Sequence, residues 1–116
     1  MSMYITPYSR LIRQPQRYAG TVDSEIHVPL DVIETEDSYL IEMIVPGLKP
    51  EDLEIEIVEK AIAIQGEFKP AAEDRRFLRQ ERPTGKFRRV IRLPKLLNME
   101  KSEANLENGI LDVGCK

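Results

Sequence analysis

The pattern of apolar and polar positions is that of a β protein over most of the chain. From residue 29 onward, apolar side chains recur at every second position in short runs, separated by proline, glycine, asparagine or paired acidic residues. This period of two puts alternate side chains on opposite faces of a strand. In LEIEIVE, Leu53, Ile55 and Ile57 share one face. Glu54 and Glu56 share the other, which we expect to face solvent.

The same pattern predicts several more strands. PLDVIET and SYLIEMIV are separated by Glu36-Asp37, a break of the length of a hairpin turn. AIAIQGE, KFRRVIRLP and ILDVG follow, and RFLRQE is a short apolar segment within a polar stretch. Segment 99–106 has a helical alternative, but Asn98, Asn105 and Asn108-Gly109 favour turns. Roughly eight short strands with almost no helix predict an all-β fold, a β-sandwich.

The length of 116 residues suits one domain. We expect a flexible N-terminal arm over residues 1–27, because this part contains two prolines and a glycine and has no sustained period. A short helix around 9–13 is the alternative there. The sandwich is expected over 28–114, followed by a residual tail, 115–116.

Composition narrows the class of protein. With 41% hydrophobic and 32% charged residues, the chain can bury a core and stay soluble. No apolar run is long enough for a transmembrane helix, and the N-terminus lacks the apolar stretch of a signal peptide. The single cysteine, Cys115, cannot form an internal disulfide. We therefore expect a cytoplasmic protein that is not attached to a membrane.

The sequence carries no pattern of catalytic or metal-binding residues. One histidine and one cysteine cannot form a metal site by themselves, and the carboxylates do not have the spacing of metal ligands. The six glycines are isolated, so no phosphate-binding loop is predicted. No serine or cysteine lies in a nucleophile-elbow setting. We expect no enzymatic activity, no metal and no cofactor.

Charge is segregated along the chain although the net charge is only −3. Residues 31–59 contain ten acidic residues and one base, Lys49. Residues 75–95 contain nine basic residues and one acid, Glu81. Two solvated faces of opposite sign explain this pattern, and so does contact between the two regions within one chain or between two. The acidic total argues against a nucleic-acid binder.

An ordered set of short motifs resembles the small heat-shock protein family over residues 28–113. The motifs are Pro46-Gly47-Leu48, Glu81-Arg82, Gly85-x-Phe87-x-Arg89, Leu93-Pro94 and the run from Ala104 to Gly109-Ile110-Leu111. The resemblance implies an α-crystallin domain, which is an immunoglobulin-like β-sandwich that dimerises. It also implies an ATP-independent chaperone, a holdase that binds unfolding proteins and suppresses their aggregation.

The resemblance further implies a homodimer formed by strand exchange, in which RFLRQE pairs with the PLDVIE edge of a second subunit. A mobile charged loop is the alternative. Arg89 is in phase with the apolar side of its strand, where a guanidinium is costly without a partner. We predict that it forms an ion pair with a carboxylate of region 31–59, on its own or the neighbouring subunit. The implied interface residues are Leu30, Val32, Phe77, Leu78, Arg79, Glu81, Arg82, Gly85, Phe87 and Arg89.

Client proteins are expected to bind at apolar groove residues, at the arm, or at both. The groove residues are Leu53, Ile55, Ile57 and Leu106, and ordinary core packing explains them equally well. The arm residues are Tyr4, Ile5, Tyr8, Leu11 and Ile12. The family's Ile-x-Ile/Val extension is not present after the last strand, so a dimer is expected rather than a large assembly built by tail docking. A higher oligomer that assembles in another way is the alternative.

Two other functions compete with the chaperone. One is an adaptor that uses the same sandwich to dock on a single folded partner. The other is nucleic-acid binding through the basic residues of 75–95, which the lack of aromatic residues interleaved with those arginines disfavours.

Overall fold

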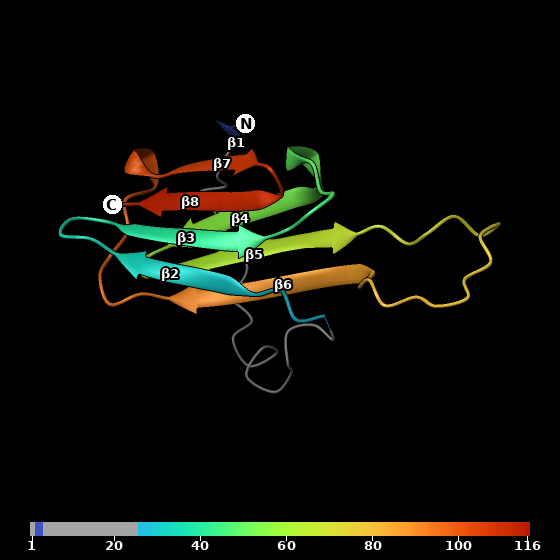
Figure 1. Ribbon diagram of the computed structural model, residues 1–116. Helices are drawn as coiled ribbons and strands as arrows, with labels where there is room; N and C mark the ends of the chain where they lie inside the picture. The colour runs from blue at the N-terminus through green and yellow to red at the C-terminus, as the bar shows by residue number, and fades with distance from the viewer. Residues whose placement is uncertain (1, 4–25) are drawn as a thin grey trace.

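The chain forms two antiparallel sheets that pack against each other (Figure 1). The computed structural model describes residues 2–3 and 26–116. The larger sheet has the order β1-β7-β8-β3-β2, and the smaller has the order β4-β5-β6. The strands are β1 (Ser2–Met3), β2 (Leu30–Glu34), β3 (Tyr39–Ile44), β4 (Leu53–Val58), β5 (Ala61–Phe68), β6 (Gly85–Arg92), β7 (Glu103–Glu107) and β8 (Ile110–Cys115). The all-β sandwich predicted from the sequence is confirmed.

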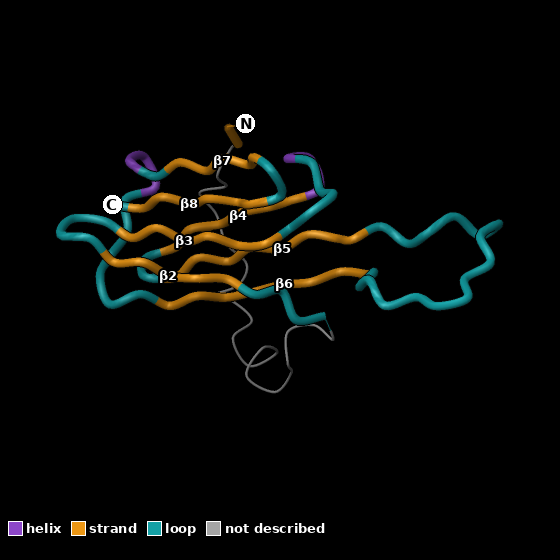
Figure 2. The backbone as a smooth tube through the Cα atoms, in the orientation of Figure 1, coloured by secondary structure: helices purple, strands orange, loops and turns teal. Residues whose placement is uncertain are grey.

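Short connections join most neighbouring strands, and Figure 2 shows how little helix the described chain contains. In the described residues the helices are two 3-10 turns, η1 (Pro50–Asp52) and η2 (Met99–Lys101). Between β7 and β8, Asn108 and Gly109 have φ angles of 53° and 78°. Positive φ at both positions is what a tight two-residue hairpin requires, and asparagine and glycine adopt it at little cost.

The alternation predicted for LEIEIVE is observed in β4, with one difference. Leu53, Ile55 and Ile57 are buried and Glu54 is exposed, as expected. Glu56, however, is only 9% exposed. The expectation that both glutamates face solvent is therefore wrong for Glu56. Alternation determines which face of the sheet a side chain is on, but not whether that face is open to water at each position.

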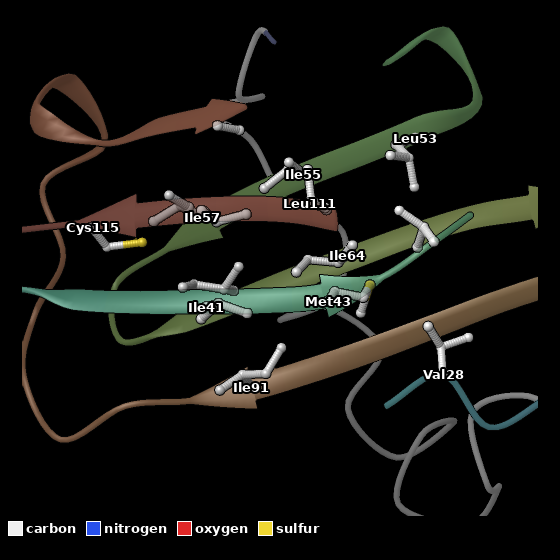
Figure 3. Packing of buried hydrophobic residues seen from close by; sticks show 14 of the residues in the cluster. Val28, Ile41, Met43, Leu53, Ile55, Ile57, Ile64, Ile91, Leu111 and Cys115 are labelled. Atoms are coloured by element: carbon white, nitrogen blue, oxygen red, sulfur yellow. The ribbon is translucent and has the colours of Figure 1, made fainter. Parts of the chain in front are cut away.

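The core lies between the two sheets, and Figure 3 shows its side chains interdigitating. Ile41 and Met43 of β3 and Leu111 of β8 come from the larger sheet, while Ile55 and Ile64 come from the smaller one. All five are fully buried. Burial of apolar side chains on both inner faces is the main stabilising contribution in such a sandwich.

A glycine in β5 makes room for an aromatic ring in the core. Gly66 lies directly opposite Leu53 on one side and Phe87 on the other. A Cβ at Gly66 would lie 2.8 Å from Cζ of Phe87, 2.9 Å from Cδ2 of Leu53 and 3.0 Å from the carbonyl oxygen of Asp52. The Phe87 ring packs beside that of Phe68, with 5.3 Å between ring centroids. The absence of a side chain at Gly66 therefore allows this packing.

A long connection between β5 and β6, residues 69–84, extends beyond the end of the sandwich (Figure 1). The two strands pair from Ala61 opposite Arg92 to Phe68 opposite Gly85. The connecting residues contain no strand, so RFLRQE has no β partner within the described chain. We call residues 69–84 the β5–β6 loop.

Two local features differ from the sequence-based expectations, and a third agrees with them in part. Ser2–Met3 was expected within an unstructured arm but forms β1, which pairs with β7. Segment 99–106 forms no α-helix: it begins with the 3-10 turn η2 and continues into β7, so turns are confirmed around Asn98 and Asn108 but not at Asn105, which lies in the strand. Strand β8 continues one residue past the expected boundary and buries Cys115. No helix in the described part of the chain is long and apolar enough to cross a membrane.

Candidate functional site

Strand β2 is the open edge of the larger sheet. It pairs with β3 in register from Leu30 opposite Met43 to Glu34 opposite Tyr39, and its other side pairs with no strand in the described chain. Leu30 is half-buried, but Val32 is 43% exposed although it faces the core side. An edge of this kind offers unpaired backbone N–H and C=O groups to a second strand.

The β5–β6 loop presents apolar side chains to solvent. Phe77 is 44% exposed and Leu78 is 96% exposed. The loop also contains an ion pair in which Nη1 of Arg79 lies 3.1 Å from Oε2 of Glu81. Both side chains of this pair are mostly exposed, so it contributes little to stability. Single exposed apolar side chains are common on protein surfaces, so the exposure of Phe77 and Leu78 does not by itself assign this loop to an interface.

Gly85 ends the loop and begins β6. Its φ of +114° is in the region that only glycine adopts readily, and the position where a Cβ would stand is 3.4 Å from Cδ1 of Ile26. The glycine of the predicted Gly-x-Phe-x-Arg motif therefore allows the sharp return into the sheet. Phe87, two residues later, is buried in the core.

Arg89 has a backbone partner within the chain. It is half-buried in β6, opposite Ile64, and its Nη1 donates to the carbonyl oxygen of Val28 at 2.7 Å. No carboxylate of the described residues lies within ion-pair distance of it. The bond ties β6, an edge of the smaller sheet, to the segment that leads into β2. An ion pair with another subunit stays a prediction.

The remaining interface and client residues are distributed as follows. Arg82 is exposed in the loop. Leu53, Ile55, Ile57 and Leu106 are all buried in the core, so core packing is the interpretation that the structure supports for these groove residues. Their role in client binding stays a prediction. The arm residues Tyr4, Ile5, Tyr8, Leu11 and Ile12 lie outside the described residues.

Carboxylates form a row across the outer face of the larger sheet. Asp31 of β2 pairs with Glu42 of β3, which pairs with Asp112 of β8. Like charges directly opposite each other on neighbouring strands are destabilising in isolation. The row begins at the open β2 edge, so this edge is acidic as well as unpaired. No group of three or more potential metal-ligating residues is formed among the described residues.

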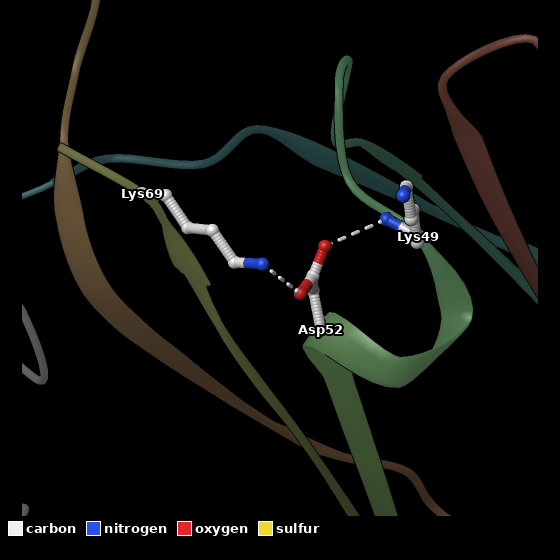
Figure 4. A network of polar contacts seen from close by, with 3 residues as sticks. All are labelled: Lys49, Asp52 and Lys69. Atoms are coloured by element: carbon white, nitrogen blue, oxygen red, sulfur yellow. Dashed lines mark hydrogen bonds and ion pairs between the residues drawn. The ribbon is translucent and has the colours of Figure 1, made fainter. Parts of the chain in front are cut away.

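Asp52 of η1 organises the turn that precedes β4, as Figure 4 shows. Its Oδ2 accepts the backbone N–H of Lys49 at 2.9 Å, and its Oδ1 lies 3.3 Å from Nζ of Lys69. The Lys49 N–H is the larger cause that holds the pKa of Asp52 below its ordinary value of 3.8, and partial burial opposes it. The ion pair between Asp52 and Lys69 therefore links this turn to the end of β5, where the β5–β6 loop begins.

The comparisons with known proteins agree with this geometry. Residues 31–116 match the Hsp20/alpha crystallin family. The chain is 33% identical over 102 residues to the 17.8 kDa class I heat shock protein of Solanum lycopersicum, covering 85% of this chain and 66% of that protein. It is 29% identical over 111 residues to the 18 kDa antigen of Mycobacterium leprae, covering 96% of this chain and 75% of the other.

Solved structures show the same fold. Heat shock protein 16.0 from Schizosaccharomyces pombe superposes with a TM-score of 0.72 at 28% identity, covering 78% of this chain and 86% of that one. The hspA protein from Xanthomonas axonopodis superposes with a TM-score of 0.70 at 26% identity, covering 79% of this chain and 94% of that one.

Because its two antiparallel sheets superpose on those of solved heat shock proteins, the chain has the α-crystallin type of β-sandwich. The chain belongs to the Hsp20/alpha crystallin family.

Sequence reasoning missed two parts of this site. The partner of Arg89 is a backbone carbonyl, and a carbonyl has no residue type that a pattern can reveal. The link between Asp52 and Lys69 joins positions 17 apart in sequence that meet only because η1 lies beside the end of β5.

Proposed function

We propose that the protein is an ATP-independent holdase, which binds unfolding proteins and suppresses their aggregation without a catalytic step. The observation that carries this proposal is the family match over residues 31–116, because chaperone activity is the property for which this family is known. The chain spans 66% of the length of the Solanum lycopersicum relative. Holdase activity and client binding are therefore proposed for this chain.

The proposed active form is a homodimer in which the β5–β6 loop of each subunit lies along the β2 edge of the other. Three features support this arrangement. Strand β2 is open, Phe77 and Leu78 are exposed, and the arginine-bearing loop has the charge opposite to that of the carboxylate row that begins at Asp31. Pairing by backbone hydrogen bonds would place Phe77 and Leu78 on opposite faces of the extended sheet and would bring the two charge regions together.

Light scattering of a heat-aggregating enzyme tests the holdase. The enzyme is heated without ATP, with and without this protein at increasing ratios of subunits. We expect suppression near equimolar subunits, and the same suppression when ATP is added. Bovine serum albumin at the same mass concentration serves as the control for non-specific protection. If aggregation is unchanged although native mass shows a dimer, the holdase proposal is wrong, and the adaptor interpretation takes its place.

A further inference from the structure

A cavity of about 720 Å³ opens at the end of the sandwich from which the β5–β6 loop emerges. Its walls come from four segments that are distant in sequence: residues 27–29 before β2, residues 44–52 from the end of β3 through η1, residues 68–69 at the end of β5, and loop residues 82–84. This volume is in the range of pockets that bind small organic molecules.

The wall of the cavity is partly apolar. Phe68 at the end of β5 and Leu48 in the turn are half-buried and pack against the core, so they provide a fixed surface. Ile44 at the end of β3 is 49% exposed. An apolar wall of this kind gains free energy when an alkyl or aromatic group replaces water.

Three basic side chains line the same cavity: Lys49, Lys69 and Arg82. Asp52 is the one carboxylate among the described lining residues, and its two oxygens already bind the Lys69 ammonium and the Lys49 backbone N–H. In the described part of the chain, no carboxylate lies within ion-pair distance of the Lys49 ammonium or the Arg82 guanidinium. Two cationic groups are therefore available beside an apolar wall.

We propose that this cavity binds a small amphipathic anion, a carboxylate attached to an alkyl or aromatic group. The carboxylate lies between Lys49 and Arg82, where the guanidinium offers two parallel donors. The apolar part lies against Phe68, Leu48 and Ile44. This ligand class follows from the cavity alone and does not depend on holdase activity.

Titration of the full chain with decanoate below its micelle concentration tests the proposal. Calorimetry gives affinity and stoichiometry, and backbone amide chemical shifts of ¹⁵N-labelled protein give the location. We expect saturable binding of one decanoate per subunit, with the largest shifts at Gly47, Leu48 and Thr84, which line the cavity. 1-Decanol, which has the same alkyl chain without the charge, is expected to bind more weakly.

Charge variants are the central comparison. Lys49→Gln is expected to weaken decanoate binding about fivefold and to leave decanol binding unchanged. The double variant with Arg82→Gln is expected to weaken it about tenfold or more. Lys60→Gln is the matched control, because Lys49 and Lys60 are exposed lysines in the two connections that flank β4 and only Lys49 lines the cavity. Equal affinity of Lys49→Gln and Lys60→Gln for decanoate would overturn the proposal.

Two substitutions of isoleucine by glutamine test the apolar wall of the cavity in the same way. Ile44→Gln is expected to weaken binding of both probes, whereas Ile33→Gln is not. Both isoleucines are exposed on the larger sheet, at 49% and 40%, and only Ile44 lines the cavity. If decanoate binds only after the dimer is dissociated, a second copy of the chain occupies the cavity and the small-anion proposal fails.

Discussion

Gly66 shows how a single missing side chain shapes this core. Adding a methyl group there would bring it within 3.0 Å of three heavy atoms, one of them the backbone oxygen of Asp52. We expect Gly66→Ala to lower the free energy of unfolding by about 1–3 kcal/mol, because the Phe87 ring has to move from its packed position. Urea denaturation followed by circular dichroism measures this change.

The matched control is Gly114→Ala in β8, where an added Cβ meets no atom within 4 Å. Like Gly66, Gly114 lies within a strand without a positive φ. We expect this variant to be as stable as the wild type or slightly more stable, because alanine has fewer unfolded conformations than glycine. Equal destabilisation by the two substitutions would show that close packing is not the function of Gly66.

Substitution of Arg89 separates two possible roles: a hydrogen bond within the chain and an ion pair between subunits. Arg89→Met keeps the apolar stem and removes the donor to the Val28 carbonyl, so we expect stability to fall by about 1 kcal/mol. Arg92→Met, an exposed position in the same strand, is the control. Chemical denaturation measures the stability of each variant, and native mass spectrometry measures whether it forms a dimer.

The two measurements distinguish the roles of Arg89. A loss of stability with an unchanged dimer shows that Arg89 acts through its hydrogen bond to the Val28 carbonyl within the chain. A loss of dimer mass supports the predicted ion pair between subunits. If neither stability nor mass changes relative to Arg92→Met, Arg89 has neither role.

The sequence predicted the position of Arg89 in the fold but not its hydrogen-bond partner. The period of two placed Arg89 in phase with Phe87 and Ile91, and both of these are buried. Its partner did not follow from the sequence, because the carbonyl of Val28 comes close only when the segment before β2 crosses β6. Chemistry that depends on backbone atoms from distant segments has no pattern in the sequence.

At the scale of elements, the β5–β6 loop and the β2 edge make the sharpest prediction. We expect Leu78→Asp to shift the population from dimer toward monomer, because it adds a negative charge to the loop segment that the proposed dimer places along the acidic β2 edge. Sedimentation velocity at micromolar concentration measures the shift. Thermal unfolding of the sandwich is expected to change little, since Leu78 is 96% exposed in the single chain.

Leu96→Asp is the control for this change. Leu96 is also an exposed leucine in a loop, at 68%, but it lies between β6 and η2. A dimer that withstands Leu78→Asp as well as Leu96→Asp would contradict strand exchange through this loop.

Strands with strict alternation were predictable, and those that depend on pairing alone were not. LEIEIVE alternates strictly and forms β4, and SYLIEMIV, which is apolar at most positions, forms β3 with alternating burial. Ser2–Met3 is too short to have a period, and it forms β1 only because β7 offers backbone partners at Ala104 and Asn105. RFLRQE is the reverse case, since its apolar residues form no strand where the chain itself has no partner for them.

At the scale of the whole molecule, Cys115 reports on cooperative opening of the sandwich. Its side chain is fully buried, and burial raises the pKa of the thiol while a hydrogen bond with Ser102 opposes the rise. We expect labelling by a thiol reagent to be at least about a thousandfold slower in the native protein than in urea, because the sandwich has to open first. Mass spectrometry of the alkylated protein measures the rate. Labelling at the rate of the unfolded chain would show that the end of β8 opens independently.

The two edges of the larger sheet are not equivalent, and this difference limits how copies of the chain can be added. One edge is partly occupied by the chain's own β1 at Ala104 and Asn105, whereas β2 is open. A sheet with two open edges can act as a link in a chain of copies and grow into a fibre. Where β2 is the edge used for this kind of contact and β7 is not, two copies that engage each other through their β2 edges form a closed pair. Pairing of Ser2–Met3 with Asn105 and Ala104 thus disfavours end-to-end growth of the sheet through the β7 edge.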